Sequence, residues 1–189
     1  MNLAAYLSGT VDVLRGGDDW TRRFDLTRRG FKQSFVALIL SVPALFTAAL
    51  GIASQRAVLL GTDPAAIPVA AFGIIAGLYL LSFSATAYMI TMFFDRQDRF
   101  RPWVITRHWA VFFMSLLVAV GFGTYLLGWL PFAAANAVAF VVFMGVLAVD
   151  IMLAIRVANF RWGGAVYAAC AIAAMGLCVL LFGTAQFSG

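Results

Sequence analysis

Five long apolar stretches alternate with short polar segments along the chain. Each stretch is close to the roughly 20 residues that a helix needs to cross a bilayer. Apolar runs of this length and continuity predict membrane-spanning helices. The predicted spans cover residues 34–53, 67–94, 109–129, 133–155 and 164–182.

The first 33 residues follow a different pattern, in which leucine and valine recur at every third or fourth position. This spacing predicts one face of an amphipathic helix. The aromatic and basic residues that follow favour a segment lying among lipid head groups. Packing beneath the bundle fits the pattern equally well, so both placements stand as alternatives. The apolar positions are Leu3, Leu7, Val11 and Leu14.

We therefore predict an all-α protein with two parts. Residues 1–33 form a cytoplasmic interfacial segment, and residues 34–189 form a polytopic bundle of five transmembrane helices. Composition supports this prediction, since 63% of the 189 residues are hydrophobic and only 11% are charged. A soluble domain carries roughly 25% charged residues.

The basic residues predict how the chain is oriented. Of 13 Lys and Arg residues, Arg56 alone lies on the side opposite the N-terminus. Cytoplasmic segments are rich in Lys and Arg, so we expect the N-terminus inside and the C-terminus outside a bacterial inner membrane. The net charge of +5 then indicates contact with anionic lipid rather than nucleic acid. The expected head-group contacts are Arg22, Arg23, Arg28, Arg29 and Lys32.

Asp150 is the one acidic residue inside a predicted span. A carboxylate there is costly unless it has a partner or a function. One interpretation is a pair with a neighbouring helix, whose first turns carry Arg107 and His108. The other is a site for an ion or a proton, approached along hydroxyl groups of the second span. The candidate polar site comprises Asp150, His108, Arg107, Ser84, Tyr88 and Thr91.

Small residues predict where helices approach closely. Gly73 and Gly77 form a GxxxG pattern on the second span, a spacing that permits close backbone contact. The fifth span carries a face of alanines that allows the same, inside the bundle or against a second subunit. These alanines are Ala165, Ala169 and Ala173.

Enzyme signatures are absent from the sequence. It contains no HExxH, no GxSxG, no P-loop and no glutamate, the patterns that mark metalloproteases, hydrolases and nucleotide-binding enzymes. His108 is the only histidine, whereas a metal site needs several ligands close together. We therefore expect no enzymatic activity, no cofactor and no metal.

The plan of the chain resembles the Yip1-type membrane proteins, which have five spans, an amphipathic cytoplasmic N-terminus and a very short outer tail. In "FDLTRRGFKQSF", Asp25, Leu26 and Gly30 stand where that family tends to have an Asp-Leu-aromatic-Gly-Pro run. The family includes bacterial members, mostly of unknown function, and eukaryotic members linked to vesicle trafficking. The resemblance assigns no functional residue.

The leading expectation is a non-enzymatic scaffold or accessory subunit that binds anionic lipid and other membrane protein subunits or a second copy. The alternative is a small oligomeric transporter or channel that uses Asp150 and the hydroxyls of the second span. An enzyme acting on lipid ranks third.

Overall fold

The computed structural model describes residues 2–63 and 67–186, which form seven helices and no strand. Five of these helices are long and apolar enough to cross a membrane. The predicted all-α fold with five spans is therefore confirmed. The helices are α1 (Leu3–Arg15), α2 (Trp20–Arg23), α3 (Arg28–Leu60), α4 (Val69–Phe93), α5 (Gln97–Leu126), α6 (Phe132–Arg156) and α7 (Trp162–Gln186).

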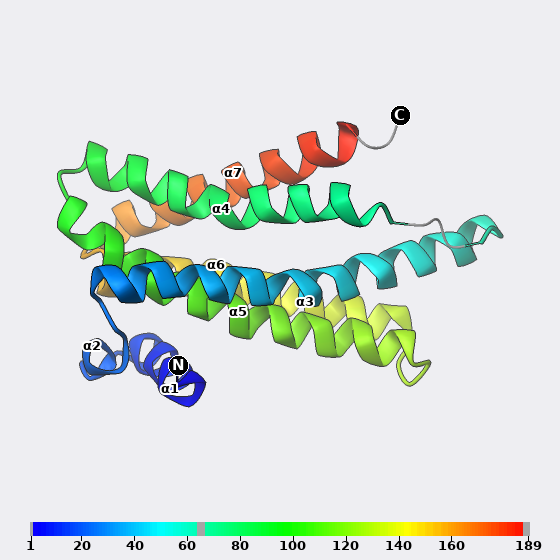
Figure 1. Cartoon of the computed structure of the whole chain (residues 1–189), viewed down its shortest axis with the longest axis horizontal. Helices are drawn as coiled ribbons and strands as arrows, with labels where there is room; N and C mark the ends of the chain where they lie inside the picture. Colours follow the sequence, from blue (N-terminus) through cyan, green and yellow to red (C-terminus); the bar gives the residue numbers. More distant parts are fainter. Residues whose placement is uncertain (1, 64–66, 187–189) are drawn as a thin grey trace.

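The long helices form two layers (Figure 1). Helices α3, α5 and α6 lie together, with α5 packed between the other two, and α7 packs mainly on α4. Successive long helices run in opposite directions. The starts of α3, α5 and α7 and the ends of α4 and α6 therefore meet at one end, where α1 and α2 also lie. We call this the basic end, because it carries most of the cations, and the opposite end the far end.

Several helices extend beyond the predicted spans. Helix α3 runs without a break from Arg28 through Pro43, so the predicted boundary at residue 33 falls inside it. Helix α5 begins at Gln97, well before the predicted start at residue 109. Hydropathy reports the part of a helix that suits a bilayer, and the polar turns beyond it remain helical. Of the predicted outer tail, residues 187–189 lie outside the described residues.

Helix α1 packs against the bundle, which is one of the two placements that the pattern left open. Of the predicted apolar face, Leu3 and Leu7 are 41% and 46% exposed, whereas Val11 and Leu14 are half-buried and Leu14 packs against the core. The most buried face lies about one position away, where Gly9 lies against the Phe24 ring. The buried residues of α1 are Tyr6, Gly9, Thr10 and Val13.

The GxxxG prediction on α4 is also wrong within the described chain. Gly73 is exposed and Gly77 half-buried, and a methyl group on either would meet nothing within 4 Å. Close packing between α4 and α7 depends instead on small residues of α7. There Gly176 faces the Tyr79 ring of α4. The predicted alanine face of α7 turns into the bundle, with Ala165 and Ala169 fully buried and Ala173 half-buried.

Candidate functional site

Arg107 of α5 and Asp150 of α6 form a two-pronged ion pair inside the bundle. Arg107 Nε donates to Asp150 Oδ1 at 3.0 Å, and Nη2 donates to Oδ2 at 3.3 Å. The residues are only 6% and 3% exposed. This fork-to-fork geometry is the strongest arrangement open to an arginine and a carboxylate. The structure thus brings together the two charged members of the predicted site.

The pair is also held by an aromatic ring from the other layer. The Arg107 guanidinium carbon lies 4.3 Å from the centre of the Phe83 ring of α4. A cation over the face of a ring is attracted by the ring quadrupole, the more so when it is shielded from water. Arg107 therefore connects α5 with both α6 and α4.

His108 bridges a different set of helices. Its Nδ1 lies 3.0 Å from Ser34 Oγ of α3, and its Nε2 lies 3.0 Å from Ser84 Oγ of α4. The histidine is fully buried. Phe35 and Phe83 face the ring edge-on, at 4.9 and 6.3 Å between centres. Both ring nitrogens thus have a partner in a site that is otherwise apolar.

Hydrogen bonds at His108 link three helices. The Ser34 hydroxyl lies within hydrogen-bond distance of both the Phe31 carbonyl, at 2.8 Å, and His108 Nδ1, at 3.0 Å. Ser84 Oγ lies 3.0 Å from Nε2. Which of the two ring nitrogens donates depends on the tautomer of the ring. A chain of hydrogen bonds therefore runs from α4 through α5 to α3.

His108 does not contact Asp150, although the sequence placed both in one site. Consecutive residues on a helix project about 100° apart. Arg107 therefore faces α6 while His108 faces α3 and α4. The two form adjacent contacts that together link α3, α4, α5 and α6, and we call Ser34, Ser84, Arg107, His108 and Asp150 the polar core.

The predicted hydroxyl path along the second span does not form. Tyr88 is 52% exposed and packs edge-on against Phe100. Thr91 is buried but donates to carbonyls of its own helix, at Ala87 and Tyr88. A buried threonine commonly satisfies its hydroxyl this way. Of the predicted hydroxyls only Ser84 joins the polar core, and it contacts His108 rather than Asp150.

Sequence reasoning missed Ser34 and Phe83. A signal for Ser34 was present, because small residues recur at helical spacing along the first span and mark the face on which α5 packs. No comparable signal singled out Phe83 among the 18 phenylalanines. The buried small residues are Ser34, Ala37, Ser41 and Ala44.

A small cavity adjoins the ion pair. It encloses about 110 Å³ between α4, α5, α6 and α7, and Arg107 and Asp150 form part of its wall. At about 30 Å³ for each molecule, this is room for three or four waters. The rest of the wall is mainly apolar, with Phe83, Leu147 and Ala173 among its residues. The ion pair therefore lies beside space that a few waters or a small ion can occupy.

The predicted head-group residues divide into two groups. Arg23 is engaged within the N-terminal segment, where its Nε lies 2.6 Å from Asp12 Oδ2 and its Nη1 donates to Ser8. Its side chain is still 40% exposed, so its predicted contact with lipid stays a prediction. Arg22 is 85% exposed and makes only a 3.7 Å contact with Asp19. The remaining members, which are exposed in the first turns of α3, are Arg28, Arg29 and Lys32.

Helix α1 is tied to the bundle by rings and by a cap. The Tyr6 ring stacks on Trp109 of α5 at 4.3 Å and on Phe24 at 5.7 Å between centres. Burial raises the pKa of the Tyr6 phenol, so the ring stays neutral. At the end of α1, Arg156 of α6 donates to the Gly16 carbonyl at 3.3 Å.

Within residues 2–63 and 67–186, no three His, Cys, Asp or Glu residues gather closely enough to hold a metal ion. Comparison with known proteins finds no matching family model, curated protein or solved structure. The resemblance to Yip1-type proteins therefore stays a prediction.

Proposed function

We propose that this chain is a non-enzymatic scaffold or accessory subunit of the bacterial inner membrane. In this proposal the N-terminus is cytoplasmic and the C-terminus lies outside. Its bundle is a stable platform that binds other membrane protein subunits, while its basic end binds anionic lipid. The observation that carries the proposal is the mutual satisfaction of the polar core inside one chain.

A scaffold needs a fixed arrangement of helices, and the polar core supplies one. Apolar side chains alone gain little by leaving lipid for the interior of a bundle. Arg107 with Asp150, and His108 with its two serines, instead connect four helices by directional contacts. Each group has a partner in the resting structure, which favours a structural role over one that must release and rebind a ligand.

The basic end supplies the surface for lipid. Arg28, Arg29 and Lys32 are exposed, and no ion pair joins them to another residue of the described chain. Each such cation contributes about 1 kcal/mol of attraction to an anionic membrane surface. The same excess of cations supports the cytoplasmic placement of this end.

Asp150→Asn tests the proposal. It removes one charge of the pair, so we expect a lower unfolding midpoint in detergent and poorer recovery of co-purifying membrane proteins. The matched control is Asp18→Asn, which changes an exposed acid between α1 and α2 that belongs to neither proposed site. Mass spectrometry after gentle purification identifies the bound subunits. Recovery of a lone monomer from the wild type would count heavily against a scaffold.

The cavity beside the ion pair supports a second candidate, a small transporter. A cation or proton entering this space would compete with Arg107 for Asp150, so the pair could serve as a gate. This candidate expects proton or ion flux in proteoliposomes, lost in Asp150→Asn while the bundle stays folded. Absence of flux in the wild type, with instability of the variant, would favour the scaffold.

A further inference from the structure

A groove of about 620 Å³ opens between α3 and α4 in the far half of the bundle. The proposed function does not use it. On α3 the groove is bounded by Ala49, Ala53 and Ala57, which are four residues apart and share one helix face. Phe72 and Ile75 of α4 form the other wall. Two apolar faces thus look toward each other without closing.

Helix α3 is held in this position by its opposite side. There Tyr125 of α5 donates to Gln55 at 3.2 Å, and Gly51 lies against the Phe122 ring. Phe46 of α3 packs against Phe72 of α4 beside the groove, with 5.1 Å between the ring centres. On α4 the groove extends from Ala71 to Ile75. Its small side chains leave room that an acyl chain would fill in a bilayer.

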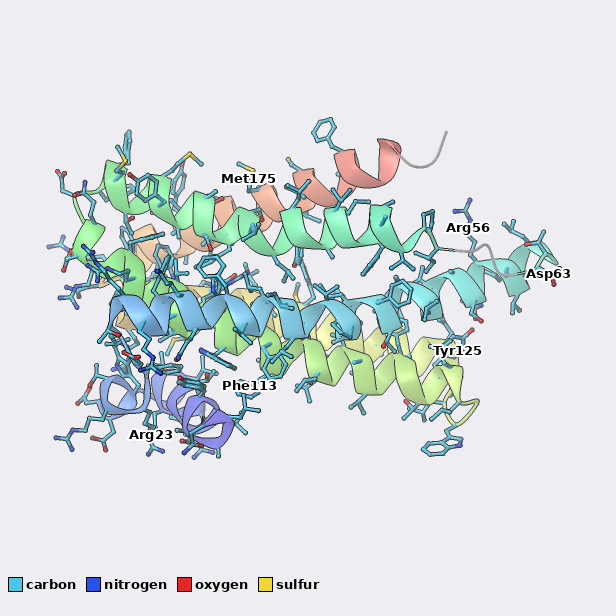
Figure 2. All side chains as sticks on the ribbon, viewed as in Figure 1. Arg23, Arg56, Asp63, Phe113, Tyr125 and Met175 are labelled. Atoms are coloured by element: carbon cyan, nitrogen blue, oxygen red, sulfur yellow. The ribbon has the colours of Figure 1, made fainter. Side chains whose placement is uncertain are left out.

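Two opposite charges lie at the mouth of the groove. Arg56 and Asp63 both line it, and both side chains are exposed. No ion pair or hydrogen bond joins Arg56 to another residue in the described part of the chain. Figure 2 shows Arg56 projecting from α3 near the start of α4, with Asp63 further out. The mouth is thus dipolar rather than simply basic.

The depth of Arg56 matches that of a lipid phosphate. Along α3, Arg56 lies about 36 Å from Lys32 at 1.5 Å per residue. The hydrocarbon core of a bilayer is about 30 Å thick. With Lys32 among the head groups at the basic end, Arg56 therefore reaches the head groups at the far end, and the part of the groove at Ala49 and Ala53 lies within the hydrocarbon.

We propose that this groove binds one zwitterionic phospholipid of the phosphatidylethanolamine type. One acyl chain lies along the alanine face of α3, the phosphate contacts Arg56, and the ammonium contacts Asp63. A zwitterionic head group matches the paired opposite charges, whereas an anionic head group would meet repulsion from Asp63. The site is independent of the proposed function, because it uses none of the polar core.

Native mass spectrometry of the full chain, titrated with phosphatidylethanolamine and phosphatidylglycerol of identical acyl chains, tests the site. We expect the wild type to bind one phosphatidylethanolamine in preference. Arg56→Gln should weaken the first binding of both lipids about fivefold, the upper range for exposed charge pairs. Asp63→Asn should weaken only phosphatidylethanolamine, so that the preference shifts toward phosphatidylglycerol.

Ala53→Phe fills the groove while leaving both charges in place, and it should abolish the specific binding of either lipid. Arg161→Gln, which removes an exposed cation at the basic end, is the matched control and should keep the wild-type preference. Unchanged lipid binding in Ala53→Phe would show that Arg56 is only an interfacial anchor. An unchanged preference in Asp63→Asn would overturn the zwitterionic assignment. If Ala53→Phe fails to fold, the two surface variants still decide the outcome.

Discussion

The two halves of the bundle are held together in different ways. In the half near the basic end, the polar core links α3, α4, α5 and α6 by directional contacts. The far half has no equivalent link between α3 and α4 among the described residues. There the faces of α3 and α4 enclose a groove, beside which the rings of Phe46 and Phe72 pack together.

The difference shows what closes a helix bundle in lipid. Lipid tails are as apolar as leucine, so an apolar face gains little by leaving them. Closure needs a polar pair that would otherwise be unsatisfied, or small residues that let backbones approach. The half near the basic end has the first. In the far half, Gly176 lets α7 approach Tyr79 of α4, whereas a groove lies between α3 and α4.

Breaking the ion pair should lower the stability of the bundle more than any other change. We expect Asp150→Ala to destabilise the bundle by about 3–5 kcal/mol, because it leaves Arg107 buried without its partner. The double variant Arg107→Met with Asp150→Leu should recover most of that loss, since two apolar side chains need no partner. Unfolding in mixed detergent micelles measures both. A double variant as unstable as the single one would contradict this account.

Removing one histidine contact should have a smaller effect. Ser84→Ala leaves His108 Nε2 without its hydrogen-bond partner, and we expect a loss of about 0.6–2 kcal/mol, as for hydrogen bonds inside membrane bundles. Ser82→Ala is the matched control, because its hydroxyl donates only to the Tyr79 carbonyl of its own helix. The same unfolding assay applies. Equal losses for the two serines would argue against a role for His108 in linking the helices.

Two glycine substitutions test which face of α4 is packed against another helix in the far half. Gly176→Ala places a methyl group about 3.0 Å from the Tyr79 ring, so the ring must shift and stability should fall by about 1 kcal/mol. Gly77→Ala meets nothing and should be neutral or raise stability by about 0.5–1 kcal/mol. If Gly77→Ala instead dissociates an oligomer on a sizing column, its GxxxG face binds a second copy.

The smallest expected effect is a pH dependence at the start of α3. Hydrogen bonds from the Thr27 hydroxyl and backbone N–H hold the pKa of Asp25 below its ordinary value. A lowered folded pKa means that this stabilisation is present above the unfolded pKa and is lost as pH falls through the folded pKa.

We therefore expect the wild type to be slightly more stable than Asp25→Asn at about pH 5, above the ordinary Asp pKa of about 3.9. The difference should disappear in more acidic solution. The unfolding midpoints of both proteins, measured across this range, provide the test. A difference that does not change with pH would mean that Asp25 acts through its shape rather than its charge.

The alternation of apolar and polar segments in the sequence by itself determined the number of spans. Each span is a local property, because about 20 apolar residues form a helix in lipid whatever their neighbours are. The pairing of Arg107 with Asp150 was also within reach of the sequence. The very short link around Pro131 makes α5 and α6 antiparallel neighbours, and both residues lie near the same end.

Only the tertiary structure decided which faces meet. His108 turns away from Asp150 because adjacent residues on a helix point in different directions. Gly73 and Gly77 face no helix because α4 packs through another side, and α1 buries Tyr6 rather than Leu3. These outcomes depend on how whole helices rotate and lean against one another. That rotation is a collective result of packing, and no local pattern of the sequence encodes it.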